Sequence, residues 1–256
     1  MNDEEPLGGG NVSPAVVRTG NTVRRPAGPH TPAVHAFLRH LHDVGFGRVP
    51  RPLGIDDDGR EILTYLPGAV VHPGHDHLLD PPRALTEIGK LIRAFHDASA
   101  EFTPPAEARW QVVIPDVGAE LIVHHDLAAW NLVRSRHGWY LIDWDTAAPG
   151  TRLWDLAYAA HSLIPLSADP GWARPDPEVR LRCLVDAYGL DENARRRLVD
   201  LLPDRTRAMY RLLQEGADTG TEPWATLWAA GHGVVWKRNT DHLERHRGTW
   251  LSALLR

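Results

Sequence analysis

The segment from Leu121 to Asp145 constrains the fold most, because polar residues separate three short apolar runs at fixed spacings. His124 and Asp126 follow the first run, Asn131 precedes the second run, and Asp143 follows the third. Short runs rich in aliphatic and aromatic residues predict β-strands. The polar side chains are therefore expected in loops where these strands begin and end.

Strands are predicted at 132–135 and 139–142, joined across the turn residues 136–138. The centre of this hairpin is expected near His137, which places Asn131 and Asp143 six residues away on either side. In an antiparallel pair they would be cross-strand neighbours at the open end of the hairpin. Asp126 lies one short loop upstream and can fold back toward the same place. Two carboxylates and an amide are oxygen ligands that suit Mg²⁺.

The spacing H-x-D-x-x-x-x-N, followed by a strand that ends in aspartate, resembles the catalytic core of the kinase fold. In detail the sequence is similar to the aminoglycoside phosphotransferase family, through I-D-W-D at 142–145 and A-A-P-G-T-R-L-W-D-L-A at 147–157. The resemblance covers about 121–158 well and the region before residue 68 more weakly. It implies a two-lobe α+β fold, with a small antiparallel sheet lobe at 1–66 and a mainly helical lobe at 67–256.

The resemblance also implies roles for individual residues. Asp126 would be the catalytic residue, orienting the substrate hydroxyl toward the γ-phosphate and accepting its proton late. Asn131 and Asp143 would hold Mg²⁺ bridging the phosphates of ATP or GTP.

The resemblance implies supporting roles around the catalytic loop for three further residues. His124 would brace the loop rather than react, Asp155 would anchor the loop from the helical lobe, and Asp145 would bind a second metal or a backbone amide. His125 departs from the family pattern, in which glycine or asparagine is common at this place.

The expected phosphate-binding lysine is missing, because no lysine occurs before Lys90. Arg24 or Arg25 is the best substitute, and strand alternation allows only one of them to face the cleft; Arg24 is preferred here. A guanidinium can bind phosphate bidentately. The helix predicted next contains no glutamate between 27 and 42, so the usual lysine–glutamate pair cannot form.

Other nucleotide contacts are expected before the helical lobe. Gly9 and Gly10, in a glycine-rich turn, could cover phosphates with backbone amides. Tyr65 and Leu66 stand just before Pro67 and Gly68, where the first lobe is expected to end.

The remaining pattern agrees with two lobes. Short strands are predicted within 7–25, at 52–55 and at 61–66, with a helix at 33–44. A second helix is predicted at about 82–98. From 153 onward the pattern is helical, with interruptions expected at 165–177, at Pro203 and at 216–223.

Composition excludes several classes of protein. A net charge of −5 argues against a nucleic-acid-binding surface, and the single cysteine excludes internal disulfides. The chain has no apolar run of 18 residues and no secretory leader pattern. A cytoplasmic protein without nucleic-acid or membrane partners is expected, whose partners are a nucleotide and a small hydroxylated molecule.

The acceptor stays open at this level. Residues 151–256 hold 15 basic and 14 acidic residues, which gives no support for a polycationic acceptor. Two alternatives to a small-molecule kinase stay open. One is a kinase-fold protein that binds nucleotide or metabolite without transfer, suggested by the missing lysine and glutamate. The other is a kinase for protein hydroxyls, which ranks lower because no peptide-docking segment is evident.

Overall fold

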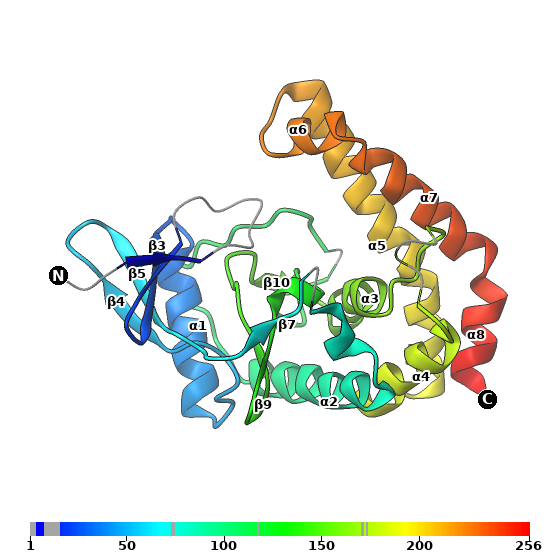
Figure 1. Ribbon diagram of the computed structural model, residues 1–256, viewed down its shortest axis with the longest axis horizontal. Helices are drawn as coiled ribbons and strands as arrows, with labels where there is room; N and C mark the ends of the chain where they lie inside the picture. Colours follow the sequence, from blue (N-terminus) through cyan, green and yellow to red (C-terminus); the bar gives the residue numbers. More distant parts are fainter. Residues whose placement is uncertain (1–3, 8–15, 73–74, 117, 170–171, 173) are drawn as a thin grey trace.

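A five-stranded antiparallel sheet with one helix forms the N-terminal region of the computed structural model (Figure 1). The structure describes residues 4–7, 16–72, 75–116, 118–169, 172 and 174–256. The strand order is β1-β2-β3-β5-β4, and the elements are β1 (Glu4–Pro6), β2 (Val17–Thr19), β3 (Thr22–Pro26), α1 (Thr31–Asp43), β4 (Pro52–Ile55) and β5 (Arg60–Thr64).

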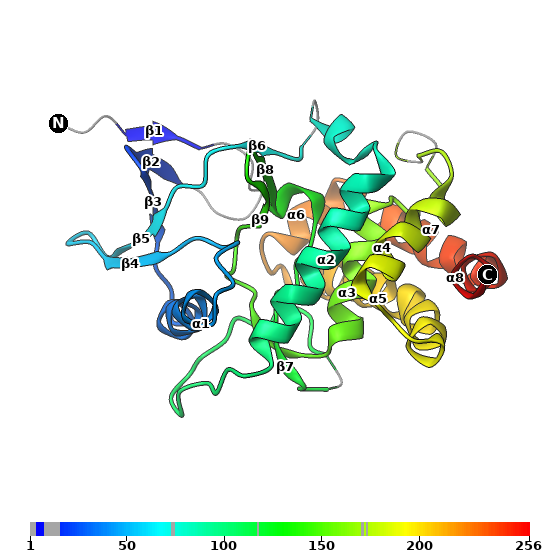
Figure 2. The same cartoon turned by 90° about the horizontal axis from the view of Figure 1, so that it is seen from below.

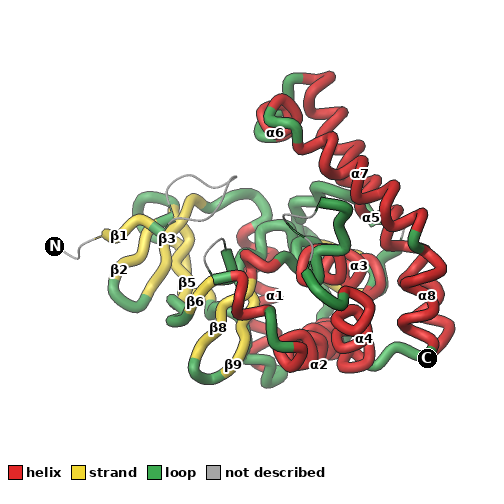
Figure 3. Tube along the Cα trace, turned by 45° about the vertical axis from the view of Figure 1, so that its right-hand side comes forward, coloured by secondary structure: helices red, strands yellow, loops and turns green. Residues whose placement is uncertain are grey.

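The chain then enters a second, mostly helical region through β6 (Ala69–Val70), which pairs with β8 rather than with the first sheet. Figure 3 shows strands gathered at one end and helices at the other. This arrangement confirms the predicted two-part α+β fold. The remaining elements are η1 (Asp76–Leu79), α2 (Pro82–Ser99), β7 (Leu121–Val123), η2 (Ala129–Asn131), β8 (Leu132–Ser135), β9 (Gly138–Leu141), β10 (Ala148–Gly150), α3 (Arg152–Leu163), α4 (Pro177–Tyr188), α5 (Glu192–Thr219), α6 (Trp224–Ala229), α7 (His232–Arg245) and α8 (Arg247–Leu255).

The prediction of a break at Pro203 is wrong, because α5 runs without interruption from Glu192 to Thr219. A proline removes one backbone hydrogen bond from a helix interior. Here Leu202, Pro203 and Thr206 are all buried, and the hydroxyl of Thr206 donates to the carbonyl of Pro203 at 3.0 Å. Tertiary packing against α3 and α7 therefore outweighs the local helix-breaking tendency.

An aromatic cluster joins the two regions beneath the polar loop. Phe37 of α1 lies 5.8 Å from Trp144, and Phe95 of α2 lies 5.0 Å from the same indole, ring centre to ring centre. Trp144 is 1% exposed, so it sits in the core between two polar neighbours in the chain. Figure 2 shows α1 and α2 on either side of the strands and loops that join the regions. Such aromatic packing fixes the position of the loop that precedes Trp144.

No helix in the described ranges has both the length and the apolar character needed to cross a membrane.

Candidate active site

The loop after β7 adopts a strained backbone that a buried carboxylate holds in place. His125 has φ = 63°, in the left-handed region that favours glycine and asparagine. Asp155, 0% exposed in the first turn of α3, accepts the backbone N–H of His124 at 3.1 Å and that of His125 at 2.8 Å. The position of Asp155 therefore agrees with its expected anchoring role.

Asp155 is kept ionised although it is buried. Burial by itself raises the pKa of a carboxyl group, but the hydrogen bond from the His96 imidazole, at 3.1 Å, and the nearby His124 and His125 outweigh it. The pKa of Asp155 is consequently lowered. His96 in turn contacts the hydroxyl of Tyr188 at 2.8 Å, so α2, α3 and α4 all support the loop.

His124 braces the same loop from the side of the hairpin. Its Nε2 lies 3.0 Å from the carbonyl of Ile142, and its Nδ1 accepts the N–H of Asp126 at 3.3 Å. The imidazole ring is fully buried and lies 4.5 Å from the ring of Trp144. Both ring nitrogens of His124 therefore hold the loop against the hairpin, and the expectation that His124 does not itself react stays a prediction.

Asp126 and Asn131 contact each other directly. The amide nitrogen of Asn131 donates to the carboxylate of Asp126 at 2.8 Å and to its backbone carbonyl at 2.9 Å. Both bonds use the amide nitrogen of Asn131, so its amide oxygen is the atom that could ligate a metal. Burial raises the pKa of Asp126, and the nearby carboxylate of Asp143 adds to this rise. Asp126 and Asp143 thus share one electrostatic environment.

The hairpin register differs by one residue from the prediction. Leu132 pairs with Leu141, and the carbonyl of Asn131 accepts the N–H of Ile142 at 3.0 Å, so Ile142 rather than Asp143 is opposite Asn131. The turn is tighter than expected, because Ser135 pairs with Gly138 and only two residues connect them. The predicted centre at His137 is therefore wrong.

Asp143 reaches the site through its own backbone conformation rather than through strand pairing. It follows the end of β9 and has φ = 63°, an uncommon conformation that is concentrated at functional sites. Its side chain is 44% exposed, whereas Trp144 beside it is buried. The strained turn therefore presents a carboxylate outward while the next side chain enters the core.

The donor set fits a hard divalent cation. Asn131 and Asp143 offer amide and carboxylate oxygens, the ligand types that Mg²⁺ prefers. Among the described residues, no group of three or more His, Cys, Asp or Glu is arranged to hold a metal. A mixed amide and carboxylate set is thus the candidate site in the described part of the chain.

Arg25, not Arg24, faces these carboxylates, so the preference for Arg24 is wrong. The guanidinium of Arg25 donates to Asp143 at 2.8 Å and also to Asp145. Arg24 instead contacts Asp56 at 3.4 Å, on the turn between β4 and β5. Arg24 and Arg25 point to opposite faces of the sheet, as strand alternation predicts. Which of these faces packs against the helical region cannot be predicted from the strand sequence alone.

Arg25 is buried at 7% exposure and surrounded by negative charge. Burial lowers the pKa of an arginine, but Asp145, Asp143 and Glu61 outweigh this effect and raise it above its ordinary value. The pKa of Asp145 shifts in the opposite direction. Burial raises it, but the hydrogen bond from His30 and the charge of Arg25 lower it by more, so the pKa of Asp145 falls below its ordinary value. The side chain of Asp145 contacts Arg25 and His30, and the expected contact of Asp145 with a second metal or a backbone amide stays a prediction.

Glu61 completes the surroundings of Arg25 and was not predicted from the sequence, whereas His35 stands where the sequence offered His35 or Val34 in place of the missing helix glutamate. Glu61, 2% exposed on β5, accepts from Nε of Arg25 and contacts Nε2 of His35 at 2.8 Å. Arg25 and Glu61 are directly opposite in the β3–β5 register. A signal was available, since an antiparallel pairing of these two strands puts opposite charges across from each other.

A second group of missed residues lies on the helical side of Asp126. Tyr158 on α3 lies close enough to Asp126 to affect its titration: burial raises the pKa of the Tyr158 hydroxyl, and the Asp126 carboxylate adds to that rise. Arg205 on α5 lies 4.2 Å from the centre of the Tyr158 ring and donates to the carbonyl of His125 at 3.0 Å. Within the described ranges, Nε and Nη1 of Arg205 have no hydrogen-bond partner. Burial lowers the pKa of this arginine, and Tyr158 and Asp126 oppose that shift.

His161, one turn beyond Tyr158 on α3, is held in its neutral form. Ser167 donates to the side-chain oxygen of Asn239 at 2.8 Å, which directs the Asn239 amide nitrogen to Nε2 of His161 at 3.2 Å. Nε2 must therefore accept a hydrogen bond. Burial and the neighbouring Arg205 lower the pKa of His161 to about 4.

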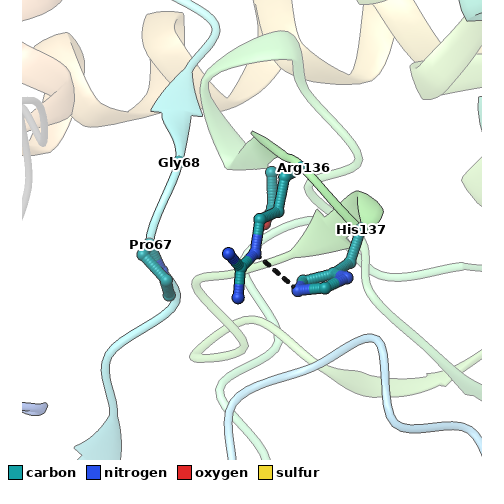
Figure 4. A pocket seen from close by; sticks show the side chains of 5 residues that line it. Pro67, Gly68, Arg136 and His137 are labelled. Atoms are coloured by element: carbon teal, nitrogen blue, oxygen red, sulfur yellow. Dashed lines mark hydrogen bonds between the residues drawn. The ribbon is translucent and has the colours of Figure 1, made fainter.

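None of the other residues predicted to bind nucleotide contacts Arg25, Asp126, Asn131 or Asp143 within the described part of the chain. Gly9 and Gly10 lie outside the described residues. Tyr65 and Leu66 lie in the connection between β5 and β6, where the Tyr65 ring stacks under Arg18, 4.1 Å from the guanidinium carbon. A cavity of about 420 Å³ beside this connection is lined by Pro67, Gly68, Ser135, Arg136 and His137. Nε of Arg136 donates to Nε2 of His137 at 2.8 Å, the contact marked by the dashed line in Figure 4. None of the proposed catalytic or metal-binding residues lines this cavity.

The sheet region, the helical region and the loop bearing Asp126 define a protein with a kinase-like fold. The sequence profile of the phosphotransferase enzyme family matches residues 5–112 and 106–199. The chain belongs to this family.

Known proteins agree with this assignment. A trifolitoxin immunity protein from Rhizobium leguminosarum bv. trifolii is 32% identical over 271 residues, covering 99% of this chain and 100% of that protein. A choline/ethanolamine kinase family protein from Mesorhizobium loti has a similar structure, with a TM-score of 0.63 at 17% identity, covering 98% of this chain and 92% of that one.

Two further solved structures share the fold at low identity. Amicoumacin kinase, in complex with AMP-PNP and Ca²⁺, has a TM-score of 0.63 at 13% identity and covers 88% of this chain and 84% of its own. The GDP complex of aminoglycoside 2′-phosphotransferase-IIIa has a TM-score of 0.59 at 14% identity and covers 96% and 93%.

Proposed function

We propose that this protein is a Mg²⁺-dependent phosphotransferase that moves the γ-phosphate of ATP or GTP to a hydroxyl group of a small molecule. The observation that supports it best is the hydrogen-bonded pair of Asp126 and Asn131 beside the outward-facing Asp143. Family membership and solved relatives bound to GDP or AMP-PNP support a nucleotide donor. The division at residue 66 into a nucleotide-binding lobe and a catalytic lobe, and a cytoplasmic location, belong to the same proposal.

Asp126 is the residue that we place against the acceptor hydroxyl. Its carboxylate would orient the hydroxyl oxygen and accept the proton as the new bond to phosphorus forms. The raised pKa favours proton uptake, and the hydrogen bond from the Asn131 amide fixes the direction of the carboxylate. The anchored backbone at His124 and His125 keeps this group in place before substrate binds.

Asn131 and Asp143 would hold the magnesium ion. When bound, the ion neutralises charge on the phosphate oxygens during transfer. Arg25 would supply the cation that most kinases take from a lysine, because its guanidinium lies against Asp143 and Asp145. Because Arg25 supplies this positive charge, the missing lysine is no longer an argument for a protein that binds nucleotide or metabolite without transferring phosphate.

The acceptor is the least constrained part of the proposal. Trp130, 40% exposed and adjacent to Asn131, could form one wall of the acceptor pocket. The relative named as a trifolitoxin immunity protein matches over the full length of both chains. This likeness supports a toxin or antimicrobial compound as the acceptor, with modification of that compound protecting the cell.

Two measurements test the proposal. MgATP or MgGTP should raise the melting temperature of the protein, and Asp143→Ala should remove this effect, whereas the exposed control Asp57→Ala should retain it. A screen of hydroxylated metabolites, antibiotics and toxins for nucleotide-dependent gain of one phosphate should then find the acceptor. If Asp126→Ala transferred phosphate to that acceptor at the wild-type rate, the role given to Asp126 would be wrong.

A further inference from the structure

Each of the three nitrogens of the Arg25 guanidinium donates to a different carboxylate, and these three partners are buried to different degrees. Nε donates to Glu61, whose side chain is 2% exposed. Nη1 donates to Asp143 and Nη2 to Asp145, whose side chains are 44% and 25% exposed. The inner contact is therefore shielded from water, while the two outer carboxylates are partly exposed to solvent.

Glu61 also joins Arg25 to the helix of the sheet region. Its second carboxylate oxygen lies 2.8 Å from Nε2 of His35 on α1, and His35 is 4% exposed. The pair Arg25–Glu61 is formed within the sheet, across β3 and β5. His35 adds the connection to α1 that the missing helix glutamate would otherwise make.

We propose that Glu61 is the positioning residue that anchors Arg25, and that Asp143 and Asp145 are partners that Arg25 exchanges for nucleotide phosphates. The proposal rests on the proposed function and assigns residues to its phosphate-binding step. Nε stays on Glu61 while Nη1 and Nη2 turn from the carboxylates to phosphate oxygens. His35 keeps Glu61, and so Arg25, in register with α1.

Charge and burial both support a permanent contact of Arg25 with Glu61 and exchangeable contacts with Asp143 and Asp145. Breaking a buried ion pair by removing one partner leaves an uncompensated charge and costs far more than breaking an exposed one. The exchange should therefore occur at Asp143 and Asp145 rather than at Glu61. Three carboxylates around one arginine leave two negative charges unbalanced, which a divalent cation on the outer carboxylates would neutralise as Arg25 releases them.

The first test compares a nucleotide with its nucleoside. Glu61→Gln keeps the size of the side chain and removes its charge. In calorimetric titrations, the affinity for MgATP should fall roughly tenfold, the loss expected for a hydrogen bond to a charged group, while the affinity for adenosine stays within twofold. MgGTP and guanosine replace these probes if the wild-type protein binds guanine nucleotides more tightly. Asp56→Asn, which removes the carboxylate partner of Arg24 in the same sheet, should change neither affinity.

The second test applies if Glu61→Gln folds poorly. The double variant Arg25→Met/Glu61→Gln leaves neither an arginine nor a glutamate unpaired in the core. Because Glu61 acts through Arg25, the double variant should bind MgATP as tightly as Arg25→Met alone.

Three results would overturn the inference. They are equal losses of MgATP and adenosine affinity in Glu61→Gln, unchanged MgATP affinity in that variant, and a further tenfold loss in the double variant relative to Arg25→Met. Each of these leaves the proposed function intact, because the wild-type protein still binds nucleotide. A wild-type protein that binds no nucleotide would overturn the proposed function and this inference together.

Discussion

Replacing Asp155 by asparagine should both destabilise the protein and disable its loop. The carboxylate accepts backbone N–H groups of His124 and His125 on different oxygens, at 3.1 and 2.8 Å, and a third hydrogen bond from His96 at 3.1 Å. Asparagine keeps one acceptor oxygen but turns an N–H donor toward at least one of these donors. The left-handed backbone at His125 then loses a contact that holds it.

The magnitude follows from these contacts. A hydrogen bond to a charged group contributes about 1.5–3 kcal/mol, and an unsatisfied buried donor adds its own desolvation cost. For a site that is fully buried we expect the free energy of unfolding to fall by about 3–5 kcal/mol. Out of a typical total of about 5–15 kcal/mol, this loss is large but compatible with folding at low temperature.

Urea unfolding followed by tryptophan fluorescence and circular dichroism would measure this difference. Asp97→Asn is the matched control, since Asp97 bonds to Arg93 and Arg152 at the surface with its side chain 49% exposed; it should change stability by less than about 1 kcal/mol. Below its melting temperature, Asp155→Asn should also lose MgATP-dependent transfer. An Asp155→Asn protein within about 1 kcal/mol of the wild type would refute the anchoring argument.

Two further predictions concern Arg25 and His161. Arg25→Met should weaken MgATP binding at least tenfold in calorimetry, whereas Arg24→Met on the same strand should change it less than about twofold; the reverse ranking would contradict the observed strand facing. His161 has a folded pKa of about 4 against an ordinary 6.5, so its contribution to stability is fully present above pH 6.5 and is lost as the pH falls toward 4. This loss amounts to roughly 3 kcal/mol. His161→Gln keeps an acceptor for Asn239 but does not titrate, so its unfolding free energy should fall by about 3 kcal/mol less than that of the wild type between pH 7 and pH 4. Equal pH dependence in both proteins would show that His161 is not held neutral.

The sequence by itself determined the local part of the site. Asp126, Asn131 and Asp143 lie within one loop and one hairpin, so short-range geometry is enough to bring them near one another. Even so, the register was predicted one residue off, because the two-residue turn at Arg136 and His137 is not distinguishable by composition from a three-residue one.

Only the tertiary structure decided which distant residues complete the site. Arg25 meets Glu61 across 36 positions of chain and Asp143 across 118, and Arg205 meets His125 across 80. Strand alternation states that Arg24 and Arg25 face opposite ways, but the side that is buried depends on how the sheet packs against the other region. The helix through Pro203 follows the same rule, since burial against neighbouring helices outweighs a local preference of a few kcal/mol.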